Sequence, residues 1–161
     1  MVVTKAIYMS KEGLAKLQEE LEHLKTVKRH EISKKIAVAR EFGDLKENAE
    51  YHAAKEEMAL LENKIMSLEE KLSRARIIDV SELPQDEVTI FTVVTLKDLD
   101  TNKEVTYELV PQEEADIDNN KIPVNAPVAK ALLGKKVNDK VEIEVPRGVF
   151  NYQILSLSKS Y

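Results

Sequence analysis

Two carboxylates three residues apart, Asp44 and Glu47, are the residues of this chain best suited to chemistry. Magnesium prefers oxygen ligands and commonly takes only one or two protein carboxylates, with water and phosphate completing its coordination. The pair can therefore supply part of a magnesium site, but the sequence around it offers no phosphate-binding glycine loop and no nucleophile with an adjacent base. The remaining ligands would have to come from a partner. A second metal ion completed in this way could stabilise an in-line displacement at phosphorus and lower the pKa of an attacking water.

The same spacing also has a purely structural interpretation. Asp44-x-x-Glu47 matches a capping box, in which the first acid accepts from backbone N–H groups at the start of a helix and the second acid reaches back. Both acids would also suit the positive end of the helix dipole. Because helix caps are far more common than metal sites, these four residues alone favour capping, and the choice between the two interpretations stays open at this point.

Two long helical segments must position these acids. Gly43 is one of only two glycines before residue 134, and no proline occurs before Pro84. Ser10 is a suitable N-cap for the first segment. The apolar residues of this segment follow a heptad spacing, slip where Lys28 occupies the next seam position, and then resume. The apolar positions are Leu14, Leu17, Leu21, Leu24, Ile32, Ile36 and Ala39, and the stripe runs up to Phe42.

The second segment keeps an unbroken 3-4 spacing, which is typical of a left-handed coiled coil. Its apolar positions are Tyr51, Ala54, Met58, Leu61, Ile65, Leu68, Leu72 and Ala75. We expect an antiparallel helical hairpin, in which each arm of about 30 residues spans roughly 45 Å. Continued backwards, the spacing reaches Glu47 and Asp44, where burial of charge in the seam would be unfavourable. The sequence therefore predicts that both acids are exposed at an open tip, near residues 43–51.

The chain beyond residue 80 has a different pattern. A polar link containing Pro84 is followed by β-type segments at residues 88–96, 104–110, 141–145 and 149–157, and by a short helix at residues 126–133. We therefore predict two domains, a coiled-coil hairpin over residues 1–80 and a small α+β domain over residues 81–161.

Composition excludes several classes of protein. The chain has no cysteine, which rules out disulfides and thiol nucleophiles and is compatible with a cytoplasmic location. No apolar run is long enough for a membrane span, so no membrane association is expected. Residues 1–80 hold 15 basic and 15 acidic side chains, and residues 81–161 are acidic. Neither half has the net basic charge of a free nucleic-acid binder. Six basic residues of the first arm are expected to form a solvated face or to steer a nucleic acid: Lys25, Lys28, Arg29, Lys34, Lys35 and Arg40.

The tip sequence resembles a known family. Residues 43–56, GDLKENAEYHAAKE, are similar to the tip signature of the Gre family of transcript cleavage factors. The segments VNAPVAK at residues 124–130 and LLGK at residues 132–135 also match that family, and the resemblance covers essentially the whole chain. It implies an FKBP-like C-terminal domain that docks on the rim of bacterial RNA polymerase. It also implies a hairpin that enters the secondary channel of the polymerase and stimulates Mg²⁺-dependent cleavage at the extruded 3′ end of backtracked RNA.

The resemblance also implies a role for individual residues. Asp44 and Glu47 match the catalytic acids, which would share a Mg²⁺ ion with the polymerase and bind none alone. The tip-flanking residues that would face RNA or the polymerase active centre are Arg40, Asn48, Tyr51 and Lys55. The docking residues would be Asn125, Ala126 and Pro127, although many relatives carry serine at the position of Ala126. The chain would be a monomeric accessory factor and not itself an enzyme.

Two alternatives belong to other classes of function. One is a regulator that binds in the polymerase channel and inhibits the polymerase without promoting cleavage. The regular Asp44/Glu47 pair argues against this first alternative. The other is a plain coiled-coil adaptor, in which the two acids only cap a helix.

Overall fold

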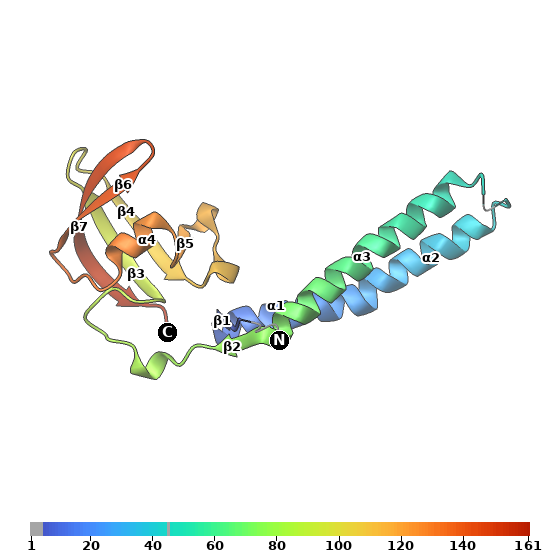
Figure 1. Ribbon diagram of the computed structural model, residues 1–161, viewed down its shortest axis with the longest axis horizontal. Helices are drawn as coiled ribbons and strands as arrows, with labels where there is room; N and C mark the ends of the chain where they lie inside the picture. Colours follow the sequence, from blue (N-terminus) through green and yellow to red (C-terminus); the bar gives the residue numbers. More distant parts are fainter. Residues whose placement is uncertain (1–4, 45) are drawn as a thin grey trace. The chain divides into compact units, whose positions relative to one another are not determined.

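The computed structural model describes residues 5–44 and 46–161, so Leu45 of the tip sequence and the first four residues lie outside the described part. The chain divides into two compact units, with the boundary between Ile77 and Ile78. A long helical hairpin forms the first unit and a five-stranded sheet with a short helix forms the second (Figure 1). Both parts of the predicted fold class, the α-helical hairpin and the α+β domain, are confirmed. No helix in the described part of the chain is long and apolar enough to cross a membrane.

The first arm of the hairpin consists of three consecutive helical pieces. They are α1 (Lys11–His23), the π-helical turn η1 (Leu24–Lys28) and α2 (Arg29–Arg40). Ser10 is the N-cap of α1, as expected, and its side chain accepts a 2.9 Å hydrogen bond from the Gly13 N–H. The arm therefore begins at the predicted residue and ends just before the tip.

The π-helical turn explains the slip in the heptad spacing at Lys28. The Arg29 N–H donates to the Leu24 carbonyl five residues earlier, so this turn holds one residue more than an α-helical turn. Leu24 and Ile32 lie eight residues apart instead of seven, and both are buried. The extra residue in the turn thus keeps the apolar stripe on one side of the arm. The Thr26 hydroxyl donates to the Glu22 carbonyl at 2.8 Å within the same region.

The second arm is a single helix, α3 (Ala49–Arg74), which runs antiparallel to the first arm (Figure 1). The buried residues of the hairpin include Leu24 and Ile32 from the first arm and Leu61, Ile65 and Leu68 from α3, all of which are predicted seam positions. At the base, β1 (Ile7–Met9) pairs in parallel with β2 (Ala75–Ile77). This short ladder joins the start of the first arm to the end of the second arm.

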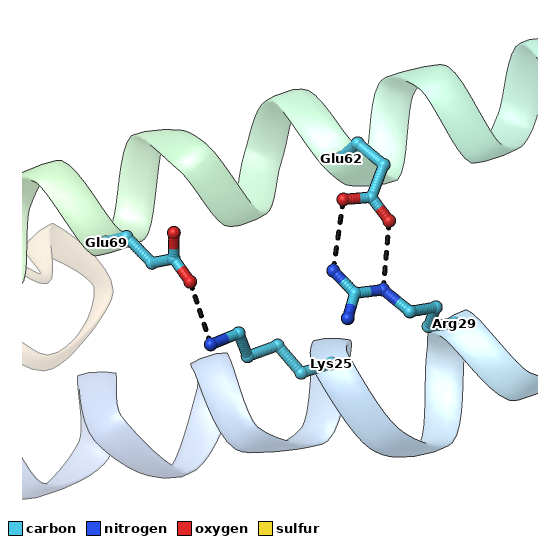
Figure 2. A network of polar contacts seen from close by, with 4 residues as sticks. All are labelled: Lys25, Arg29, Glu62 and Glu69. Carbon is cyan, nitrogen blue, oxygen red and sulfur yellow. Dashed lines mark hydrogen bonds and ion pairs between the residues drawn. The ribbon is translucent and has the colours of Figure 1, made fainter.

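Ion pairs link the two arms beside the apolar seam. The pairs are Lys25–Glu69 at 2.8 Å, Arg29–Glu62 at 2.9 Å and Lys35–Glu57 at 3.1 Å. Figure 2 shows the first two, in which Arg29 contacts both carboxylate oxygens of Glu62. Residues that flank a coiled-coil seam commonly pair in this way and so fix the register of the helices. These three basic residues of the first arm stay partly or largely exposed, as expected of a solvated face, and each also pairs with an acid of the second arm.

The second unit is built on one mixed sheet in the order β5-β4-β3-β7-β6. Only the β4–β5 pair is parallel among the ladders of this sheet that the structure describes. The strands are β3 (Thr92–Asp98), β4 (Glu104–Val110), β5 (Lys121–Pro123), β6 (Lys140–Val145) and β7 (Gly148–Lys159). The helix is α4 (Pro127–Leu132), and single 3-10 turns lie at η2 (Val80–Glu82), η3 (Gln112–Glu114) and η4 (Ile117–Asn119).

The core of this unit lies between α4 and the sheet. Ala129 and Leu132 of α4 pack into the same buried cluster as Leu96, Leu109 and Ile154 of the sheet. Pro127 occupies the first turn of α4, where its missing N–H needs no partner. The unit therefore has an apolar core of its own, separate from the seam of the hairpin.

The first strand of the second unit begins later than the spacing predicts. Residues 88–91 precede the strand, and Ile90 and Phe91 form a turn in which Phe91 adopts a left-handed conformation with φ of 64°. Lys159 supports this turn by donating to the Glu87 carbonyl and to the hydroxyls of Thr89 and Thr92. Partial burial of the ammonium lowers the pKa of Lys159 from its ordinary value. The sequence pattern could not reveal this network, because Lys159 is about 70 residues away along the chain from the groups that it contacts.

Candidate functional site

The turn that joins α2 to α3 presents both predicted acids to solvent. Gly43 has a φ of 106°, a left-handed conformation in which any residue with a Cβ is strained, and this conformation reverses the chain. One carboxylate oxygen of Asp44 accepts a 3.0 Å hydrogen bond from the Lys46 N–H. Glu47 is exposed, and no group in the described residues forms a hydrogen bond or ion pair with it. The prediction of two exposed acids at an open tip is therefore confirmed by the geometry.

The capping-box interpretation of these acids is wrong. The N-cap of α3 is Asn48, whose Oδ1 accepts a 3.0 Å hydrogen bond from the Tyr51 N–H. The Asn48 side-chain amide also donates to the Ala39 carbonyl at the end of α2. Asn48 thus performs the capping that the sequence pattern would assign to Asp44, four residues earlier. The carboxylates of Asp44 and Glu47 are left without a capping role.

The other flanking residues gather around one aromatic ring. The Arg40 guanidinium lies 5.9 Å from the centroid of the Tyr51 ring, and the Lys55 ammonium lies 6.0 Å from it. At these distances the ring attracts both cations. Because Arg40 belongs to α2 and the other two belong to α3, the contact also joins the two arms. The structure therefore brings Arg40, Tyr51 and Lys55 together, and Asn48 bonds to the main chain of Tyr51.

His52 restrains the tip in a way that the sequence pattern did not reveal. Its Nε2 lies 3.1 Å from the Lys46 carbonyl, and its ring packs edge-on against Tyr51 at 5.7 Å between centroids. Lys46 is also the residue whose N–H contacts the Asp44 carboxylate. Asp44 is thus connected through Lys46 to the first turns of α3. A histidine in the first turn of a helix gives no signal in the sequence that its ring lies against a backbone carbonyl six residues earlier.

Phe42 is exposed, although the sequence pattern places it in the apolar stripe of the first arm. The apolar stripe of the first arm was predicted to run up to it, yet its side chain is 68% exposed. The spacing from Ala39 is correct for the seam, but Phe42 lies beyond Arg40, where α2 ends. Phe42, Asp44 and Glu47 together line an open depression at the tip, which Asn48, Ala49 and Glu50 complete.

The exposed carboxylates fit magnesium as a partial ligand set. Carboxylate oxygens are the ligands this ion prefers, and among the described residues only one oxygen of Asp44 accepts a hydrogen bond. Glu50 borders the same depression, but in the described part of the chain no three acidic or histidine side chains are grouped closely enough to hold a metal. The tip can therefore contribute ligands to a metal site that another molecule completes.

The predicted docking residues lie in the second unit, in the turn that leads into α4. Asn125 is exposed, and its side-chain amide donates to Gln112 Oε1 at 2.9 Å. Ala126 is the N-cap residue of α4 and Pro127 is its exposed first residue. The main chain and a side-chain hydrogen bond thus hold these three residues in one fixed turn.

Comparison with known proteins places the chain among transcription factors. Residues 7–77 match a family model described as transcription elongation factor, N-terminal, and residues 83–159 match one described as transcription elongation factor, GreA/GreB, C-term. The chain is 50% identical over 150 residues to transcription elongation factor GreA of Chloroherpeton thalassium, covering 93% of this chain and 95% of that one. It is 48% identical to transcription elongation factor GreA of Clostridium botulinum strain Langeland, covering 99% and 100%.

A solved structure shows a more distant likeness. The crystal structure of GreA factor homolog 1 of Thermus thermophilus is 28% identical, with 96% of this chain and 99% of that chain covered and a TM-score of 0.44.

Proposed function

The chain belongs to the GreA/GreB family of transcription elongation factors, and from that premise we propose that its acidic tip completes a metal site of RNA polymerase. In this proposal the hairpin enters the secondary channel of the bacterial polymerase, and the tip stimulates cleavage of RNA whose 3′ end has been extruded by backtracking. The factor activates the polymerase and is not itself the enzyme. The observation that carries the proposal is the exposure of Asp44 and Glu47 at the end of the hairpin, where neither caps a helix.

Asp44 and Glu47 would hold Mg²⁺ jointly with the polymerase. When bound, the ion supplies activation of a water and stabilisation of the charge that develops at phosphorus. The contribution of the chain is to present two exposed carboxylates at the tip, one of them oriented by a hydrogen bond. The Lys46 N–H orients the Asp44 carboxylate, and the contact between Lys46 and His52 ties that turn to α3. A ligand held in this way loses less freedom on binding than a ligand on a loose loop.

The cations next to Tyr51 would orient the RNA and would weaken the repulsion between the tip carboxylates and the RNA phosphates. Two carboxylates alone would repel the phosphates of an RNA 3′ end. Arg40 and Lys55, held against the Tyr51 ring, place two positive charges at the end of α2 and in the first turns of α3. We assign these two residues to the RNA backbone or the walls of the active centre, and we assign Tyr51 and Asn48 to holding the arms together beneath the tip.

The second unit would anchor the factor outside the channel. We propose that Asn125, Ala126 and Pro127 contact the rim of the polymerase, since they form an exposed turn with a fixed conformation. This assignment separates binding, in the second unit, from chemistry, at the tip of the first unit.

The substitution Asp44→Asn tests the proposal directly. An asparagine amide oxygen can still accept from the Lys46 N–H, so the turn should persist, but the side chain is neutral and a poorer ligand for Mg²⁺. We expect at least a tenfold loss of transcript cleavage in stalled, backtracked elongation complexes, with unchanged binding to the polymerase. Cleavage by this variant at the wild-type rate would reject the metal role.

A matched control is Glu19→Gln. Glu19 is an exposed acid of α1, in the part of the hairpin opposite the tip, and its replacement changes the net charge by the same amount. It should leave cleavage unchanged. A wild-type protein that binds the complex and slows elongation without producing short 3′ RNA fragments would instead support the channel-inhibitor function.

A further inference from the structure

Phe42 is the largest apolar side chain exposed at the tip, and the proposed function leaves it unused. It is 68% exposed, and it follows the last residue of α2 by two positions. Covering an exposed aromatic ring with a partner removes apolar surface from water and so lowers the free energy of the complex. A single exposed apolar residue is common on protein surfaces, so its neighbours must decide whether a ligand binds there.

The neighbours of Phe42 exclude an apolar partner and favour a nucleobase. The depression that Phe42 lines is bordered by the carboxylates of Asp44, Glu47 and Glu50. An apolar protein surface pressed onto Phe42 would remove water from these carboxylates without pairing them, which is unfavourable. A nucleobase covers an aromatic ring with a flat face of similar size, and its edges and ribose keep polar groups and water near the acids.

We propose that Phe42 forms a stacking subsite for one nucleobase of the extruded RNA 3′ end. This inference rests on the proposed function, because it needs single-stranded RNA to reach the tip. Stacking on an aromatic side chain tolerates every base, since each has a π face, so the subsite would position RNA without selecting sequence. A base held by Phe42 would fix its phosphodiester near the two carboxylates that line the same depression.

The variant Phe42→Ala measures the contribution of the ring. From the usual strength of base–aromatic stacking, cleavage at subsaturating factor should fall by roughly 5- to 160-fold. Phe42→Tyr, which keeps the ring, should restore most of the rate. The control is Met66→Ala, which truncates a side chain that is 66% exposed on α3, remote from the tip, and should have no effect.

A set of transcripts separates RNA stacking from a contact with the polymerase. Each transcript in the backtracked complex carries an abasic residue at one of the extruded positions. If Phe42 stacks on a base, wild type and Phe42→Ala should cleave at equal rates when that base is missing, and should differ when any other base is missing. An equal loss for Phe42→Ala on every transcript would show a contact with the polymerase protein and overturn the inference.

The same assay distinguishes failure of the inference from failure of the proposed function. Loss of cleavage by Asp44→Asn together with full activity of Phe42→Ala would reject the stacking subsite and leave the metal role intact. Absence of cleavage by the wild-type protein would reject the proposed function itself, and the subsite with it. Because Phe42 is exposed, its replacement should not change the helical circular dichroism of the chain, which checks that the variant is folded.

Discussion

Asn48 caps α3 at the tip, so the carboxylates of Asp44 and Glu47 are not needed for capping and are available to bind a ligand. Its side chain accepts from the Tyr51 N–H and donates to the Ala39 carbonyl, and therefore joins the end of α2 to the start of α3. An aspartate can act as an N-cap as well as an asparagine can, but it has no N–H to donate. The choice of asparagine at this position thus reflects a need for both an acceptor and a donor.

Replacement of Asn48 should loosen the tip in two separable steps. Asn48→Ala removes both hydrogen bonds and should destabilise the hairpin by about 1 kcal/mol, within the usual range for loss of an N-cap. Asn48→Asp keeps the bond from the Tyr51 N–H and loses only the bond to Ala39. Thermal unfolding followed by circular dichroism should rank the proteins as wild type, Asn48→Asp, Asn48→Ala. Equal stability of wild type and Asn48→Ala would show that the cap is not needed.

At the scale of elements, the first arm combines an irregular helix with a continuous seam. The π-helical turn η1 absorbs one residue between Leu24 and Ile32, so both face α3. One ion pair within this turn, Lys25–Glu69, and one directly after it, Arg29–Glu62, then hold the arms in register (Figure 2). Exposed pairs of this kind contribute little individually, typically about 0.2–1 kcal/mol. Their main effect is on which register the helices adopt.

Deletion of one residue should therefore be tolerated at the π-helical turn and should destabilise the hairpin elsewhere in this arm. Deletion of Thr26 should convert the π-helical turn into an α-helical turn and leave Ile32 and Ala39 facing the seam. Deletion of Ser33, in α2, should rotate Ile36 and Ala39 by about 100° around the helix and away from α3. We expect the first variant to unfold close to the wild-type temperature and the second to unfold well below it. Similar losses in both variants would contradict the role assigned to the π-helical turn.

The arms were predictable from the sequence because their signal is repeated many times. Seven of the eight predicted seam positions lie in α3 and indicate the same face, so a single exception such as Ala75, which begins β2, cannot change the result. The tip depends on single residues, and there the pattern misled. Phe42 has the correct spacing for the seam but no opposing helix, and Asp44-x-x-Glu47 matches a capping box although Asn48 is the cap. Periodicity shows which face of a helix is apolar, but it does not show where the partner helix stops.

At the scale of the molecule, the two units have separate cores and, in the proposed function, separate tasks. Among residues 5–44 and 46–161, no buried residue belongs both to the seam of the hairpin and to the core of the second unit. A substitution at the tip should therefore leave the second unit folded, and a substitution in the turn before α4 should leave the hairpin folded. The proposed binding and the proposed chemistry can then be removed one at a time.

This separation predicts that a variant with an inactive tip will compete with the wild-type factor. Asp44→Asn should occupy the polymerase normally, because the docking residues Asn125 and Pro127 are unchanged. When the two proteins are mixed at saturating total concentration, cleavage should fall in proportion to the fraction of the variant and reach about half at an equal ratio. Quantifying the short 3′ RNA fragments across a series of mixtures would measure this dependence.

The double variant Asp44→Asn/Asn125→Lys supplies the control for competition. Asn125 is exposed and bonds only to Gln112 among the described side chains, so a lysine there should disturb the proposed contact surface without affecting the core. This protein should no longer reduce cleavage by the wild-type factor at an equal ratio. If it competes as well as Asp44→Asn, the turn before α4 does not contact the polymerase, and the binding energy must come from the hairpin or from another face of the second unit. If Asp44→Asn itself fails to compete, binding depends on the tip carboxylates, and the division of tasks between the two units is wrong.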